Sequence, residues 1–343
     1  MNARERMLAA LAFQPVDKVP LQIHPSPAGL FEHGQKLLDR MQACPHDFGD
    51  LSDLELPVVP AQDFEADGRY HKISTDAWGT TWEYRLFGVW GYRVGYPLAD
   101  MARLADYQPP TIQPLAGSEL ERQAAAGAAH RRQYFHLGGG ASLFESMQSL
   151  RPFEEVLIDI ARDTPEINRL ADMLLEYNLR MVENALAVGV DAVGVGDDFG
   201  TQQALMLSPK TWRRFFLPRY RVLFKPVKKA GKRIFFHSCG KIDPILEDLA
   251  AAGADAIWPQ LPLFDPRSLA QRCRALGLAV QLHPDRGELL QRATPQQVRA
   301  YLLDLVEQFD CLSGGSWLYL EVDPGFPWEN VRAMFETVME LRK

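Results

Sequence analysis

The chain has 343 residues, of which 47% are hydrophobic and 24% are charged, and its formal net charge is -7. These proportions are typical of a globular protein with a large core. The negative charge and the absence of a basic tract argue against a nucleic-acid partner. No apolar run approaches the roughly 20 residues that a membrane-spanning helix needs, so no membrane association is expected.

Cysteine usage and the first residues bear on the compartment. The four cysteines, Cys44, Cys239, Cys273 and Cys311, are too few and too scattered for a disulfide framework. The first 13 residues contain an early acidic side chain and no long apolar segment, which predicts an amphipathic helix and not a signal peptide. We therefore expect a cytoplasmic protein with reduced thiols.

The first third of the chain shows a mixed pattern. A helix is expected at residues 3–13 and a first strand at residues 19–24. An aromatic-rich hairpin is expected at residues 70–85, with a further strand at 87–96. We interpret residues 28–130 as a region inserted after the first strand, which would form a cap.

After about residue 131, strands and helices alternate regularly. The strands are expected at residues 133–137, 191–196, 233–239, 255–258, 278–282 and 316–320, and the helices at about 141–149, 154–162, 164–188, 208–230, 244–253, 265–276, 294–309 and 328–342. This alternation predicts a parallel sheet. With the first strand the count is seven, and an eighth could lie between residues 141 and 163. We predict an α/β fold, a single (β/α)8 TIM-type barrel over residues 1–343, and not a doubly wound open sheet, because the N-terminal glycine-rich dinucleotide fingerprint is absent.

Functional side chains stand at the carboxyl ends of most predicted strands. They are His24, His136, Asp197, Asp198, His237, Cys239, Trp258, Gln260, His283, Asp285, Glu321 and Asp323. Barrel enzymes build their active sites at this end of the strands. We expect these side chains to converge on one mouth.

His237 and Cys239 form the most informative pair. They lie two residues apart at the end of a strand, so they project to the same face. An imidazole and a thiol together suit zinc, and a catalytic zinc usually has a third protein ligand. Glu321 is our choice, because a carboxylate after an apolar strand is costly without a partner. The other candidates are Asp323, His283, Asp285 and His24. The alternative is a structural histidine beside a buried, unreactive cysteine.

Asp197 and Asp198 point to opposite faces of their strand, so at most one faces the pocket directly. That carboxylate would orient substrate or support a ligating histidine, and Gln202 could add an amide contact. The alternative is a helix cap with a solvated loop.

His283 and Asp285 could bind metal or move protons. The alternative is a loop ion pair between Asp285 and Arg286. The side chains expected to contact substrate are His24, His136, Trp258, Gln260 and Trp317.

Several segments carry a family resemblance in combination. They are residues 5–11 with 16–20, 189–192 with 196–202, 237–240 with 253–256, and 327–331. Together they resemble the uroporphyrinogen decarboxylase superfamily over nearly the whole chain. The resemblance implies a (β/α)8 barrel.

Departures from the family pattern bear on the chemistry. True uroporphyrinogen decarboxylases carry an arginine-rich segment after the first strand, whereas residues 22–29 contain no arginine. The other branch contains zinc-dependent methyltransferases that work with corrinoid proteins, and their His-x-Cys pair binds zinc together with a later cysteine. That cysteine is absent here, and Glu321 stands near its place. A His/Cys/Glu site is a harder Lewis acid, better suited to an ether or alcohol oxygen than to a thiol.

The resemblance therefore implies a zinc-dependent methyltransferase that moves a methyl group between a small methylated substrate and a corrinoid protein, which supplies the cobalamin. Zinc would be held by His237, Cys239 and Glu321. The residues expected to position substrate or move its proton are Asp197, Asp198, Gln202, His283 and Asp285. The alternatives are a cofactor-free decarboxylase or lyase acting on a small acid, and a non-catalytic corrinoid- or tetrapyrrole-binding module. The oligomeric state stays open.

Overall fold

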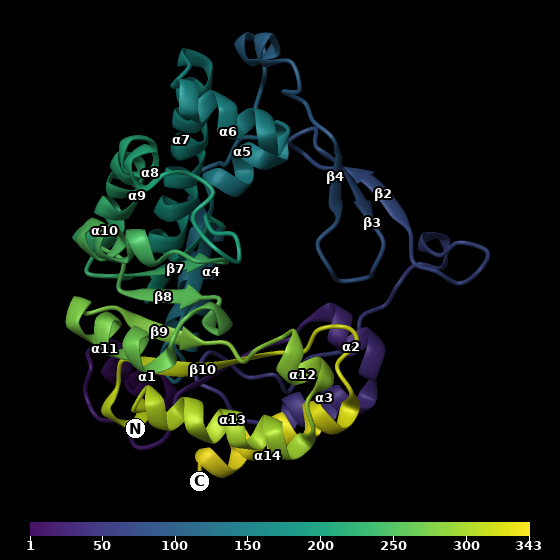
Figure 1. The fold of residues 1–343 in the computed structure, drawn as a ribbon, viewed down its shortest axis with the longest axis vertical. Helices are drawn as coiled ribbons and strands as arrows, with labels where there is room; N and C mark the ends of the chain where they lie inside the picture. Colours follow the sequence, from purple (N-terminus) through teal and green to yellow (C-terminus); the bar gives the residue numbers. More distant parts are fainter.

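A computed structural model describes residues 1–343 (Figure 1). Seven strands form one parallel sheet in the order β1-β10-β9-β8-β7-β6-β5. They are β1 Leu21–His24, β5 Leu137–Ala141, β6 Ala192–Gly196, β7 Arg233–Ser238, β8 Ala256–Pro259, β9 Ala279–Leu282 and β10 Ser316–Glu321. The predicted α/β fold with a parallel sheet is confirmed.

Helices precede, connect and follow the strands of the large sheet, and most of them lie outside it (Figure 1). They are α1 Ala3–Leu11, α4 Gly117–His130, α5 Phe144–Leu150, α6 Phe153–Arg162, α7 Pro165–Val188, α8 Pro209–Phe215, α9 Leu217–Lys229, α10 Leu246–Ala252, α11 Pro266–Leu276, α12 Glu288–Arg292, α13 Pro295–Gln308 and α14 Trp328–Leu341. The longest, α7, begins where the Thr164 hydroxyl accepts from the Ile167 N–H and Pro165 occupies the first turn. None of the helices combines the length and the apolar character needed to cross a membrane.

The sheet curls until its two edges are separated by a single residue. The Asp47 N–H donates to the Leu21 carbonyl of β1 (2.8 Å), and the Asp47 carbonyl accepts from the Phe135 N–H before β5 (2.9 Å). The buried Asp47 carboxylate is held in turn by Arg6 and Arg342. This residue stands where an eighth strand would be expected.

The prediction of an eighth strand between residues 141 and 163 is wrong. That stretch forms α5 and α6, and in α6 the buried Val156 and Ile160 are four residues apart, which is the spacing of one helix face. The sheet therefore has seven strands, and a closed eight-stranded barrel is not formed by regular pairing.

The region between β1 and β5 contains its own elements. They are α2 Pro27–His33, α3 Gln35–Ala43, β2 Lys72–Thr75, β3 Thr81–Tyr84 and β4 Tyr92–Gly95. The three strands form a separate antiparallel sheet, as the predicted hairpin and further strand required. This small sheet stands away from the helices that surround the large sheet (Figure 1).

The interior of the curled sheet is filled at its amino-terminal end. Its inward-facing side chains form one apolar cluster with Met7 and Leu11 of α1, namely Phe135, Ala192, Phe235, Ala256, Ala279 and Trp317. Since strand side chains alternate, the next inward positions lie progressively nearer the carboxyl ends. The cluster closes the amino-terminal end, so a cavity of the interior can open at the opposite end, where the strands finish.

Candidate metal centre and its cavity

His237, Cys239 and Asp198 are brought together by two neighbouring strands. His237 follows the inward-facing Phe235 by two residues on β7, and Cys239 comes two residues later. Gly196 of β6 is in register with His237, so Asp198 lies beside Cys239. The Cys239 N–H donates to Asp198 Oδ1 (2.6 Å), which fixes the carboxylate against the end of β7.

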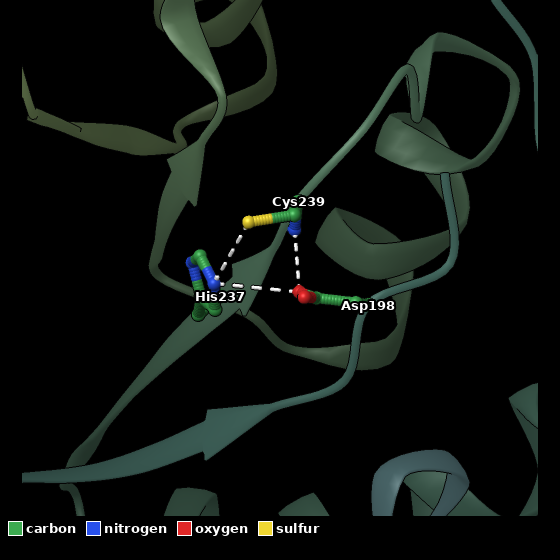
Figure 2. A group of neighbouring side chains, drawn as sticks. All are labelled: Asp198, His237 and Cys239. Carbon is green, nitrogen blue, oxygen red and sulfur yellow. Dashed lines mark hydrogen bonds and ion pairs between the residues drawn. The ribbon is translucent and has the colours of Figure 1, made fainter. Parts of the chain in front are cut away.

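The potential ligand atoms converge on one point (Figure 2). His237 Nε2 lies 3.4 Å from Asp198 Oδ1 and 3.5 Å from Cys239 Sγ. All three ligand atoms lie within 4.8 Å of one another. A zinc ion bonds nitrogen, sulfur and oxygen at about 2.0–2.3 Å, so only small side-chain adjustments would let all three bind one ion.

The tautomer of His237 is set by its second nitrogen. His237 Nδ1 lies 2.9 Å from the Trp258 carbonyl, which can only accept, so Nδ1 carries the proton. Burial lowers the pKa of His237, and the ring is therefore neutral at pH 7. Its Nε2 lone pair faces Asp198 and Cys239, which is the arrangement of a metal-binding histidine.

The protonation state of the Cys239 thiol depends on whether a cation lies beside it. Burial, followed by the negative charge of Asp198, raises the pKa of Cys239 to about 12. The group is thus a neutral thiol at pH 7 when no cation is beside it. A bound cation would reverse this preference, because a coordinating thiol is deprotonated. The donor set of nitrogen, sulfur and carboxylate oxygen fits zinc.

The group opens into a cavity of about 480 Å³ at the carboxyl ends of β7, β8 and β9. The predicted site residues that line it are His237, Cys239, Gln202, Trp258, Gln260, His283 and Asp285. Gln260 accepts from the Gly240 N–H (3.0 Å) and lies within hydrogen-bond distance of Gln202 (3.3 Å). These seven predicted residues therefore share one cavity at the carboxyl end of the sheet.

Aromatic rings form one wall of the site. The Trp258 ring lies 4.2 Å from the His237 ring, 4.6 Å from the Tyr319 ring and 5.6 Å from the His283 ring, measured between centroids. Tyr319 was not singled out from the sequence, although it precedes Glu321 by two residues on β10 and so shares its face. The period of the strand could have identified it.

Glu321 is not part of the three-residue group. Its carboxylate lies 3.8 Å from His24 Nε2, 4.0 Å from His283 Nε2 and 3.5 Å from the Tyr319 hydroxyl. Burial raises the pKa of Glu321 and lowers that of His283, whose Nε2 has no hydrogen-bond partner. The structure brings Asp198, and not Glu321, to the histidine and cysteine. Metal binding by Glu321 stays a prediction.

Asp197 faces away from the cavity and is fully buried. Its carboxylate accepts four hydrogen bonds, from the hydroxyls of Tyr220 and Ser142 and from the N–H groups of Leu143 and Glu145 at the start of α5. Burial raises the pKa of Asp197 to about 7, and the four donors oppose this by stabilising the ionised form. Its position is that of a residue that anchors α5 behind the site.

Three predicted substrate contacts do not line this cavity, and one of them, His24, lies beside Glu321 instead. Trp317 is fully buried in the apolar layer at the amino-terminal end of the sheet. His136 lies beside His130, with ring centroids 5.1 Å apart, in a separate cavity of about 680 Å³ between β1 and β5. Neither lines the cavity of the three-residue group.

The loop after β9 differs from the ion pair considered from the sequence. The Asp285 carboxylate accepts from the Gly287 N–H (2.9 Å) and so caps its own loop. Arg286 pairs with Asp323 instead. No function was predicted for Arg286 from the sequence, because its partner, Asp323, follows a different strand, β10.

Glu145 on α5 was also missed, because it does not follow a strand. Arg93 of the small sheet donates to its carboxylate (2.7 Å), and the nearby negative charge of Asp198 adds to burial in raising the pKa of Glu145. The small sheet is thus tied to a helix that borders Asp198.

Comparison with known proteins supports the fold over the full length. The solved structure titled "methyltransferase from Methanosarcina mazei" has a TM-score of 0.61 and 17% identity, and the match covers 99% of each chain. A dihydropteroate synthase from Xanthomonas albilineans (TM-score 0.39, 15% identity, 58% of this chain and 66% of that chain) and one from Vibrio fischeri (0.38, 14%, 58% and 66%) are more distant. No curated protein matches the sequence.

A sequence profile for the family described as "Uroporphyrinogen decarboxylase (URO-D)" matches residues 136–341, which is well over half of the chain. The match contains every element from β5 to α14 and includes the whole three-residue group. The chain therefore belongs to the uroporphyrinogen decarboxylase family.

Proposed function

We propose that this chain is a cytoplasmic, zinc-dependent methyltransferase that moves a methyl group between a small methylated substrate and a corrinoid protein. The observation that carries the proposal is the group of Asp198, His237 and Cys239 at the rim of a cavity large enough for a small molecule. The full-length likeness to a solved protein titled a methyltransferase agrees with it.

In this proposal zinc is held by His237 Nε2, Cys239 Sγ and a carboxylate oxygen of Asp198. When bound, it would supply Lewis acidity to the heteroatom that carries or receives the methyl group. An oxygen ligand in place of a second thiolate makes the site harder, which favours ether and alcohol oxygens over thiols as substrate atoms. We assign the third position to Asp198 because its Oδ1 already lies 3.4 Å from His237 Nε2.

The surrounding residues would orient the substrate and handle its proton. The Trp258 carbonyl holds His237 in the ligating tautomer, and the Trp258 ring offers a flat apolar surface beside it. Glu321, whose pKa is raised by burial, can hold a proton on the carboxylate oxygen that faces His283. Gln260 fixes the backbone after Cys239 through the Gly240 N–H.

We further propose that the small antiparallel sheet caps the mouth. Its link to the site is the ion pair between Arg93 of β4 and Glu145 of α5. The corrinoid partner would dock at the same carboxyl face, since only that end of the sheet opens to the candidate metal group.

Metal analysis tests the proposal directly. Protein purified without added zinc is expected to carry about one zinc ion per chain, and His237→Ala and Cys239→Ala should each lose it. Methyl transfer is then followed by the absorbance change of cob(I)alamin with a panel of methyl ethers, alcohols, amines and thiols. A zinc content below about a tenth of an equivalent that neither substitution changes would refute the metal site. Activity on a small acid that survives chelators would instead identify a decarboxylase.

A further inference from the structure

Arg286 is the one cationic side chain among the residues that line the cavity of the candidate metal group. It lies in the loop between β9 and α12, and its side chain is 47% exposed. The cavity is lined by no lysine and by no other arginine. The permanent positive charge in the cavity is therefore that of a single guanidinium.

Most of this guanidinium has no partner within the chain. Its Nε donates to the Asp323 carboxylate, and its terminal nitrogens have no acceptor. A guanidinium carries five N–H donors in a planar fork, so four of them remain for a ligand. Asp323 is not a lining residue, so this ion pair orients Arg286 without occupying the cavity.

The carboxylates that do line the cavity are engaged elsewhere. Asp285 accepts from the N–H groups of Gly287 and Leu289. Glu288 pairs with Arg292 (2.8 Å) and is 76% exposed, at the rim. Neither carboxylate competes for the terminal nitrogens of Arg286. An anion that enters the cavity would meet a preoriented and unsatisfied fork.

Arg286 lines the same cavity as His237 and Cys239 of the candidate metal group. The Trp258 ring packs on His237, between β7 and β9. One small molecule could therefore place a heteroatom at the metal group, an apolar body on Trp258 and an anionic end at Arg286.

We propose that Arg286 is the subsite for a substrate carboxylate, so that the substrate is a methylated compound, such as a methyl ether, that also carries a carboxylate. This inference rests on the proposed function for the position of the methyl group. The bidentate geometry of arginine with carboxylate supplies the recognition. Residues 22–29 after β1 contain no arginine, and Arg286 would provide anion recognition from the carboxyl end of β9.

A pair of ligands that differ only in charge tests the subsite. The affinities of 4-methoxybenzoate and 4-methoxybenzamide, and of methoxyacetate and methoxyacetamide, are measured by calorimetry on the full chain. The wild type is expected to bind at least one acid about tenfold more tightly than its amide, or better. Arg286→Gln should abolish this preference by weakening the acid alone, and Arg286→Lys, which keeps the charge without the fork, should fall between.

The control is Arg292→Gln, which removes a rim arginine and should leave the preference unchanged. Zinc content equal to that of the wild type shows that Arg286→Gln keeps the metal group intact. Equal affinities for acid and amide in the wild type, no binding of either acid, or a preference that persists in Arg286→Gln would each overturn the subsite.

The binding measurement needs neither a corrinoid nor methyl transfer, so the two proposals fail separately. Loss of the acid preference in Arg286→Gln, in a protein without zinc, would refute the proposed function and keep the subsite. Methyl transfer by a wild-type protein that shows no preference for acids over amides would support the proposed function and refute the subsite.

Discussion

Two adjacent carboxylates, Asp197 and Asp198, are expected to give opposite results when each is changed to asparagine. Asp197→Asn should destabilise the fold and leave zinc binding per folded chain unchanged. Asp198→Asn should leave the fold stable and lose zinc. The contrast follows from the strand period, which turns Asp197 toward α5 and Asp198 toward Cys239.

The magnitude for Asp197→Asn comes from its four donors. The hydroxyls of Tyr220 and Ser142 can rotate to become donors or acceptors, but the N–H groups of Leu143 and Glu145 cannot. Each carboxylate oxygen accepts from one of these N–H groups, so the amide nitrogen must face one of them and leave it without an acceptor, at about 1–3 kcal/mol. Loss of charge weakens the remaining bonds, and the free energy of unfolding should fall by about 3 kcal/mol in total.

Asp198 is more exposed, at 36% of its side chain, and its one hydrogen bond is accepted from the Cys239 N–H. The amide oxygen of asparagine can accept that bond, so the unfolding free energy should change by less than about 1 kcal/mol. Loss of an anionic ligand should weaken zinc binding by at least about a hundredfold, beyond the cost typical of an outer-shell partner.

The assays are urea unfolding of the metal-free protein and zinc titration against a competing chelator, with Glu321→Gln as the matched carboxylate control. An Asp197→Asn variant as stable as the wild type would mean that Asp197 is protonated in the native protein, in line with its pKa of about 7, and the reasoning from four donors would fail. Zinc lost from Glu321→Gln but kept by Asp198→Asn would transfer the third position to Glu321.

Two further predictions concern the same group. Because the pKa of Cys239 is about 12 without a cation, zinc binding should release one proton near neutral pH, and affinity should rise about tenfold per pH unit between about pH 6.5 and 8.5. Calorimetry in buffers of different ionisation enthalpy counts that proton, and Cys239→Ser should abolish the release; a proton count of zero in the wild type would contradict the thiol as a ligand. Gly240→Ala should weaken zinc binding at least about tenfold, because Gly240 has φ +80° and a Cβ there would lie 2.0 Å from the Gly200 backbone, forcing the Asp198 and Cys239 loops apart. Gly231→Ala, at φ +67° with open space around it, is the control and should keep wild-type zinc affinity, and equal zinc affinity in both variants would contradict this argument.

Local patterns in the sequence were sufficient for most strands of the large sheet and for the His–Cys pair, but the strand expected at residues 133–137 lies at Leu137–Ala141, and α4 and α12 were not expected. The alternation of strands and helices predicted the parallel sheet, since that pattern leaves few other topologies. The two-residue period of a strand placed His237 and Cys239 on one face, because successive side chains alternate whatever the strand packs against. The same period indicated that only one of Asp197 and Asp198 could face the pocket.

The acid beside that pair was decided by which strands are adjacent in the sheet. Asp198 follows β6, which pairs directly with β7, whereas Glu321 ends β10, with β8 and β9 in between. Both are acids after apolar strands, and from the sequence we chose Glu321 and did not consider Asp198 as a ligand. Two further outcomes depend on long-range packing. Asp47 lies where an eighth strand was expected, and Arg286 pairs with Asp323 instead of Asp285. The sequence by itself identified most of the side chains that line the mouth of the sheet, although Asp197 and Trp317 are buried elsewhere. The tertiary structure alone decided which of them meet, because contacts between strands depend on their order and register in the sheet.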